Sequence, residues 1–250
     1  MEEWFPLRII ACSGSKATMS LGLVTFHCFA VVVYLFGFWY DINFVEVPMM
    51  QFKNDMKLFK GRLKFLTIWN MLLQAIFFTI CFVNDLIGTN EDTPKKIPLI
   101  RKLKDLILPC LAFPLSMFVG LTFWAIYFVD RELIFPRALD NFFPVWLNHV
   151  MHTNIMIFIL IELFTSYRKY PSRKFGLSVL SVFMLIYLVW IHIIYAYSGM
   201  WVYPILEVLN FPLRIVFFVG LLGLSVGLYV VGEKLNAAIW NKQSHVIKKR

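Results

Sequence analysis

The stretch PVWLNHVMHTNIMIFILIELF, residues 144–164, decides the fold of this chain. Most of its residues are apolar, and a helix of roughly 20 such residues crosses about 30 Å of hydrocarbon. Near its start, Asn148, His149 and His152 stand among apolar neighbours. Polar side chains inside a membrane are costly and rarely kept without a use. The stretch therefore predicts a transmembrane helix that carries a polar cluster.

The rest of the chain is built in the same way. Of the 250 residues, 60% are hydrophobic and 16% are charged, whereas soluble domains average about 25% charged residues. This composition predicts an all-α, multi-pass transmembrane bundle that forms one domain over residues 1–250, with tails at about 1–18 and 234–250. Six apolar runs are expected to span the membrane, at about Met19–Trp39, Leu63–Val83, Leu106–Val129, Phe143–Phe164, Phe175–Tyr197 and Pro212–Gly232.

The basic residues predict the orientation. With six spans both termini lie on one side, and that side holds 16 of the 24 Lys and Arg residues. Because Lys and Arg concentrate in cytoplasmic loops, both termini are expected in the cytosol. The net charge of +9 does not indicate a nucleic-acid partner, since these residues flank spans, where they bind lipid headgroups. We expect an integral protein of the endoplasmic reticulum or plasma membrane.

The polar cluster admits several interpretations. On a helix His152 shares a face with both Asn148 and His149, and a buried histidine that bonds across helices is the plainest of them. A metal is not expected, because a zinc site needs three or four ligands and the other histidines lie elsewhere: His27, His192 and His245. No cofactor is expected either. The remaining alternative is a general base, which needs a hydroxyl within reach.

Depth in the membrane makes Thr67 one possible partner. If Trp146 and Lys64 mark the same interface, His152 lies about 9 Å and Thr67 about 4.5 Å inward at 1.5 Å per residue. A threonine in a span usually bonds its own i−4 carbonyl instead. Depth does not select Thr67 over other hydroxyls with an equal claim by spacing: Ser116, Thr122, Thr153 and Ser178.

Two further patterns concern helix shape. Pro114, in CLAFPLSMF, predicts a kink in the third span, because proline frees a backbone carbonyl. GLSVG, at residues 223–227, predicts a close helix–helix contact through its small residues.

Several segments together resemble the androgen-induced protein family, whose other vertebrate branch is the androgen-dependent regulator of tissue factor pathway inhibitor. They lie between about Lys64 and Trp240 and read KFLTIWNMLLQAIFF, FWAIYFVDRELIFP, LDNFFPVWLNHVMHT, YPSRKFGL and GMWVYPILE. The resemblance implies a six-span membrane hydrolase with a threonine nucleophile and a histidine partner. Its substrates would be fatty acid esters of hydroxy fatty acids. The family's threonine in KFLT matches Thr67, and the second histidine of NHxMHT matches His152.

This implied chemistry assigns expected roles to the neighbouring residues. Asn70 and Asn148 are candidates to stabilise an oxyanion, and His149 is expected to support or pack beside the site. Three cations near the same interface are candidates to bind the substrate carboxylate: Arg62, Lys64 and Arg131.

The alternative is a non-enzymatic membrane protein, either a scaffold or a small-solute carrier. Carriers often contain internal repeats or broken helices in matching halves. This chain has no convincing repeat, and Pro114 has no clear counterpart in the second half.

Overall fold

The computed structural model describes residues 21–46, 58–91, 94–166 and 168–247. This part of the chain is helical and contains no strand. Within it, six helices are long and apolar enough to cross a membrane, which confirms the predicted fold class. They are Leu21–Phe44, Leu66–Ile87, Leu99–Leu133, Val145–Thr165, Arg173–Ser198 and Phe211–Trp240.

Several of these spans are composed of shorter helical elements. In chain order, the elements that follow α1 (Leu21–Phe44) are η2 (Leu58–Lys64), α2 (Leu66–Ile87), α3 (Leu99–Ile107), η3 (Leu108–Ala112), α4 (Phe113–Asp130), η4 (Arg131–Leu133), η5 (Arg137–Leu139), α5 (Val145–His149), η6 (Val150–Asn154), α6 (Ile155–Thr165), α7 (Arg173–Ser198), α8 (Pro204–Val208) and α9 (Phe211–Ile247).

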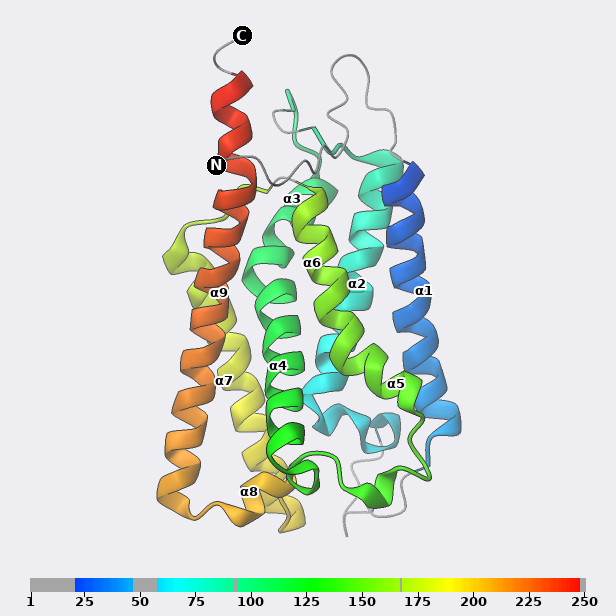
Figure 1. Ribbon diagram of the computed structural model, residues 1–250, viewed down its shortest axis with the longest axis vertical. Helices are drawn as coiled ribbons and strands as arrows, with labels where there is room; N and C mark the ends of the chain where they lie inside the picture. The colour runs from blue at the N-terminus through cyan, green and yellow to red at the C-terminus, as the bar shows by residue number, and fades with distance from the viewer. Residues whose placement is uncertain (1–20, 47–57, 92–93, 167, 248–250) are drawn as a thin grey trace, which may run out of the picture.

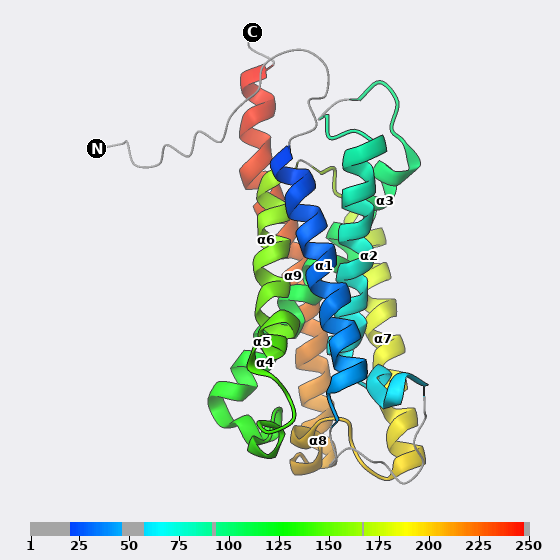
Figure 2. The same cartoon turned by 90° about the vertical axis from the view of Figure 1, so that its right-hand side faces the viewer.

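The long helices lie side by side along one axis (Figures 1 and 2). Helix α1 packs against α2, α4 lies between α6 and α9, and α7 packs against α9. Helix α1 begins, and α9 ends, at the upper end of the bundle in Figure 1, as an even number of spans requires. The short elements η2, η4, η5 and α8 gather at the lower end. The cytosolic placement of the upper end stays a prediction.

Two spans differ most in length from their predicted bounds. The third begins at Leu99 rather than Leu106, because the amphipathic helix α3 continues directly into the apolar segment. The last helix runs on to Ile247, beyond the predicted end at Gly232. An ion pair of 2.7 Å between Arg173 Nη2 and Glu233 Oε2 fixes α9 to α7 just past that point.

A π-helical segment interrupts the α-helix in each of two spans, the third and the fourth. The segment η3 ends two residues before Pro114, so the third span changes its helical geometry in the region where a kink was predicted. The segment η6 contains His152. π-bulges occur often at functional sites. This one lies in the part of the fourth span that packs against α4.

The glycines that allow close helix contact are not those the sequence indicated. At Gly223 and Gly227 an added Cβ would meet no atom within 4 Å, so the close contact predicted for GLSVG is not formed within the described part of the chain. At Gly120 in α4, a Cβ would lie 2.7 Å from the backbone oxygen of His152 and 2.5 Å from the sulfur of Met156. The close approach of α4 to η6 therefore depends on Gly120.

We expect Gly120→Ala to destabilise the protein and Gly223→Ala to leave its stability unchanged or slightly raised. The first adds a methyl group against backbone, which typically costs about 1–3 kcal/mol, while the second adds one in open space. The midpoint temperature of unfolding in detergent measures both effects. Equal midpoints for the two variants would contradict this account of the α4–η6 contact.

Candidate active site

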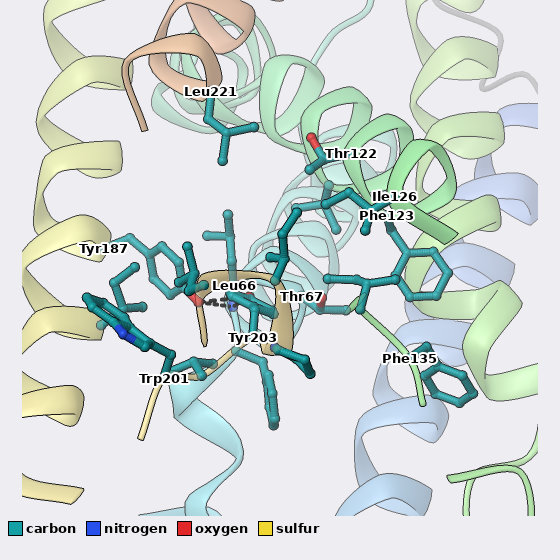
Figure 3. A pocket seen from close by; sticks show the side chains of 18 of the residues that line it. Leu66, Thr67, Thr122, Phe123, Ile126, Phe135, Tyr187, Trp201, Tyr203 and Leu221 are labelled. Carbon is teal, nitrogen blue, oxygen red and sulfur yellow. Dashed lines mark hydrogen bonds between the residues drawn. The ribbon is translucent and has the colours of Figure 1, made fainter. Parts of the chain in front are cut away.

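The lower end of the bundle contains a cavity of about 490 Å³, within the size range of small-molecule sites. Its walls come mainly from α2, α4, α7, α9, the connection between α4 and α5, and residues 200–207, which include most of α8. They are largely apolar. Tyr187 and Trp201 lie on one side and Phe123 on the other, with Thr67 between them (Figure 3). Thr67 and His152 both line this cavity.

The first turn of α2 is held in place by side chains of other elements. The Leu66 N–H donates to the hydroxyl oxygens of Tyr187, at 2.9 Å, and Tyr203, at 3.1 Å. The Tyr187 hydroxyl in turn donates to the carbonyl oxygen of Lys64 at 2.9 Å. Its proton is thereby used, so the Tyr203 hydroxyl donates to Tyr187 across 2.8 Å. Burial raises the pKa of Tyr203 above its ordinary value, which keeps this donor protonated.

This arrangement leaves the Thr67 hydroxyl without its usual local acceptor. The i−4 carbonyl of Thr67 belongs to Leu63 and already accepts two indole N–H groups, from Trp69 at 2.7 Å and Trp190 at 2.9 Å. The i−3 carbonyl, of Lys64, accepts from Tyr187. The i−4 back-bond that is common for a threonine in a span is therefore blocked at this position, because the Leu63 carbonyl already accepts two N–H groups.

The Thr67 hydroxyl instead faces a histidine. Its Oγ1 lies 3.3 Å from Nε2 of His152. The other ring nitrogen, Nδ1, lies 3.0 Å from the backbone oxygen of Asn148 and 2.8 Å from its side-chain Oδ1. A backbone carbonyl can only accept, so Nδ1 carries the proton. In the neutral ring Nε2 then presents its lone pair to Thr67, which is the tautomer that a general base requires.

Packing fixes the imidazole in this orientation. The ring of Phe123 stacks on His152 with the centroids 3.6 Å apart and the planes 14° from parallel. His152 is only 6% exposed. The hydrogen bond at Nδ1 and the stacked ring of Phe123 thus hold the imidazole with Nε2 directed at Thr67.

The other predicted polar residues have separate environments. Asn148 contacts Nδ1 of His152 and so orients the ring, in the position that an asparagine occupies in Cys-His-Asn sites. Asn70 accepts from Nε2 of Gln74 at 3.1 Å and lies outside the cavity lining. His149 is exposed, contacts Thr153 at 3.0 Å and stacks on Trp124, away from the cavity.

Of the three predicted cations, Arg62 lines the cavity. Its Nε lies 3.1 Å from Oδ2 of Asp41, and its Nη2 donates to the backbone oxygens of Asp41 and Val45. Arg131 is paired with Asp140 at 2.5 Å outside the lining. The ammonium of Lys64 lies 5.5 Å from the ring of Phe65 and is also outside it.

Sequence reasoning missed the aromatic and polar groups that complete the walls. Phe123, Tyr187 and Tyr203 read as ordinary apolar residues of a membrane protein, and their roles depend on contacts between spans. Two polar atoms in the wall, Nε1 of Trp201 and Oγ1 of Thr122, are buried without a hydrogen-bond partner. Unpaired buried polar atoms cost about 1–3 kcal/mol each, so such atoms in a cavity wall are ready partners for a ligand.

Fold and site together define a class: an integral multi-pass membrane protein of six helices, with a threonine–histidine pair in an apolar cavity. The sequence matches the family described as FAR-17a/AIG1-like protein over residues 23–237, and the chain belongs to that family. No solved structure matches it.

Named relatives cover most of the chain. The human androgen-induced gene 1 protein is 42% identical over 205 residues, which are 80% of this chain and 84% of the relative. The androgen-dependent TFPI-regulating protein of mouse is 40% identical over 81% of this chain and 89% of its own length. The human protein of that name is 37% identical over 76% of this chain and 82% of its own length. These matches confirm the family resemblance seen in the sequence.

We expect His152 to be the Nδ1–H tautomer in the purified protein. The carbonyl of Asn148 fixes the proton there, so two-bond ¹H–¹⁵N spectra of protein labelled with ¹⁵N-histidine should show a bare Nε2. The signal is assigned by its loss in His152→Gln, with His149→Gln as the matched control. A His152 signal from the Nε2–H tautomer would contradict the geometry.

Proposed function

We propose that this protein is an intramembrane hydrolase that cleaves fatty acid esters of hydroxy fatty acids, with Thr67 as nucleophile and His152 as base. The observation that carries the proposal is the contact of 3.3 Å between Thr67 Oγ1 and the unprotonated Nε2 of His152. The resemblance of KFLT and NHVMHT to the family's motifs supports it. Catalytic hydrogen bonds are often long before substrate binds and shorten in the complex.

The proposed reaction has two stages. Thr67 Oγ1 attacks the ester carbonyl while its proton moves to Nε2 of His152. The bond from the carbonyl carbon to the alkoxide then breaks, and the same proton passes to the leaving oxygen, which leaves an acyl-threonine. Water, deprotonated by Nε2, hydrolyses this ester and returns the proton to Thr67. An internal threonine has no free α-amine, so it needs an external base of this kind.

The developing oxyanion needs donors directed at it. The first turn of a helix has N–H groups without intrahelical partners. In α2 those of Leu66 and Ile68 already bond to the tyrosines and to Phe65. Among the described residues the N–H of Thr67 itself therefore remains, and we propose it as a donor. Asn70 lies one turn away with its Nδ2 buried and unpaired, but it is outside the cavity lining and we do not place it at the oxyanion. Asn148 acts through His152.

The cavity suits a lipid ester. Its apolar walls suit an acyl chain, and Arg62 is the cation in its lining among the described residues. With Nε directed at Asp41 and Nη2 at two carbonyls, Arg62 has Nη1 left for a substrate carboxylate. We propose that the enzyme works in the endoplasmic reticulum or plasma membrane, with both termini cytosolic and this cavity near the opposite face.

Thr67→Ala and His152→Ala should each lower kcat for a branched fatty acid ester by at least about 10²-fold, since loss of a general base alone costs about 10²–10⁴-fold. Hydrolysis by protein in detergent is followed by the release of fatty acid. A fluorophosphonate probe should label the wild type and fail to label Thr67→Ala.

Matched variants separate chemistry from folding. Thr79 lies on the same helix and back-bonds to Ala75 at 2.7 Å, so Thr79→Ala should keep both activity and labelling. His149→Ala should lower the rate less than about tenfold, because its ring points away from Thr67. An active Thr67→Ala would exclude this nucleophile. A folded wild type that neither labels nor turns over lipid esters would favour the scaffold or carrier.

Arg62→Gln should raise KM for a substrate with a free carboxylate by about tenfold or more, because a hydrogen bond to a charged group contributes about 1.5–3 kcal/mol and each 1.4 kcal/mol is about tenfold in affinity. Because this change leaves Asp41 unpaired, the double variant Asp41→Asn/Arg62→Gln is the better folded comparison. The methyl ester of the same substrate should show no difference between wild type and double variant. If wild type and double variant prefer the free acid over its methyl ester by the same factor, Arg62 does not bind the substrate carboxylate.

A further inference from the structure

The opposite end of the bundle contains a second cluster of reactive side chains. His27 comes from α1, Cys81 from α2 and Glu162 from α6, and all three are fully buried. One ligand atom from each lies within 4.8 Å of the other two. None of the three lines the cavity with Thr67. Imidazole nitrogen, thiolate sulfur and carboxylate oxygen are the ligands that zinc takes in proteins.

We propose that His27 Nε2, Cys81 Sγ and Glu162 Oε2 bind one divalent transition-metal ion of the zinc class. The positions of the donor atoms support this. His27 Nε2 lies 2.8 Å from Glu162 Oε2, and one ligand atom from each of the three residues lies within 4.8 Å of the other two. Cys81 Sγ lies 3.8 Å from the second carboxylate oxygen, Oε1. Because a tetrahedral zinc ion separates its N and O ligands by about 3.3 Å, His27 Nε2 and Glu162 Oε2 must move apart by roughly half an ångström to bind the ion.

The second nitrogen of His27 has the partner that metal-binding histidines use. Its Nδ1 lies 2.5 Å from Oδ2 of Asp85, a carboxylate from the same helix as Cys81. A carboxylate in this position fixes the ring and makes Nε2 a better ligand. Asp85 is the positioning residue of the site.

Glu162 divides its two oxygens between different partners. Oε1 is bound by Arg168 and lies 3.6 Å from the ammonium of Lys104, whereas Oε2 faces His27. Arg168 and Lys104 thus bind one oxygen, while Oε2, which also accepts from the Thr165 hydroxyl at 3.2 Å, is the oxygen directed at His27.

Binding of the ion releases the proton of the Cys81 thiol, because the thiolate is the form that binds a metal.

The test uses full-length protein in detergent, stripped with a chelator and titrated with Zn²⁺ or Co²⁺. We expect about one Zn²⁺ per chain by elemental analysis. Co²⁺ should give a near-ultraviolet thiolate-to-metal charge-transfer band. That band should vanish in Cys81→Ser and persist in Cys28→Ser and Cys110→Ser, the matched cysteine controls. Asp85→Asn should weaken Co²⁺ binding about 10–100-fold.

Two results would overturn the proposal. One is a folded wild type with no bound zinc and no Co²⁺–thiolate band, which would make the cluster an ion-pair network alone. The other is a band that persists in Cys81→Ser. Because Glu162 also binds Arg168, Glu162→Gln can misfold, so the wild type and the conservative Cys81→Ser decide the question. Lipid ester hydrolysis is assayed separately and does not enter either readout.

Discussion

A polar group inside this bundle can find a hydrogen-bonding partner only within the protein, because hydrocarbon offers none. The start of α2 shows the consequence. The carbonyls of Leu63 and Lys64 precede the helix and cannot bond within it. Two indoles and a tyrosine hydroxyl bind them instead. The acceptors around Thr67 are therefore occupied, and its hydroxyl turns to His152 across the interface between spans.

The same constraint determines the state of His152. Both nitrogens of an almost fully buried imidazole need a hydrogen-bonding partner. Because the Asn148 carbonyl can only accept, the proton must be on Nδ1. The π-helical segment η6 and the absence of a side chain at Gly120 bring this ring close to α4. Phe123 can then stack on it. Backbone geometry, packing and proton position are thus parts of a single arrangement, and a change in any of them alters the contact with Thr67.

The six spans and part of the candidate site could be predicted from the sequence. Apolar run lengths were sufficient to find all six helices, since membrane thickness fixes helix length directly. The i, i+4 spacing of Asn148 and His152 was visible, although the sequence indicated an oxyanion role for Asn148 rather than the orientation of the ring. Depth allowed Thr67 without selecting it, and the family resemblance supplied the choice. The reason that Thr67 differs from Thr79 lies in Trp190 and Tyr187, more than 100 residues further along the chain.

Sequence spacing fails most clearly at the upper end of the bundle. His27, Cys81 and Glu162 lie on three spans, and the first and the last are 135 positions apart in the chain. No local motif marks such a set, so a search of the sequence for clustered histidines could not find it. Helical packing places polar residues at equal depth beside one another whatever their order in the chain. In a bundle of this size the depth of a polar residue is therefore more informative than its neighbours in sequence. The two polar centres, one at each end, are both formed in this way.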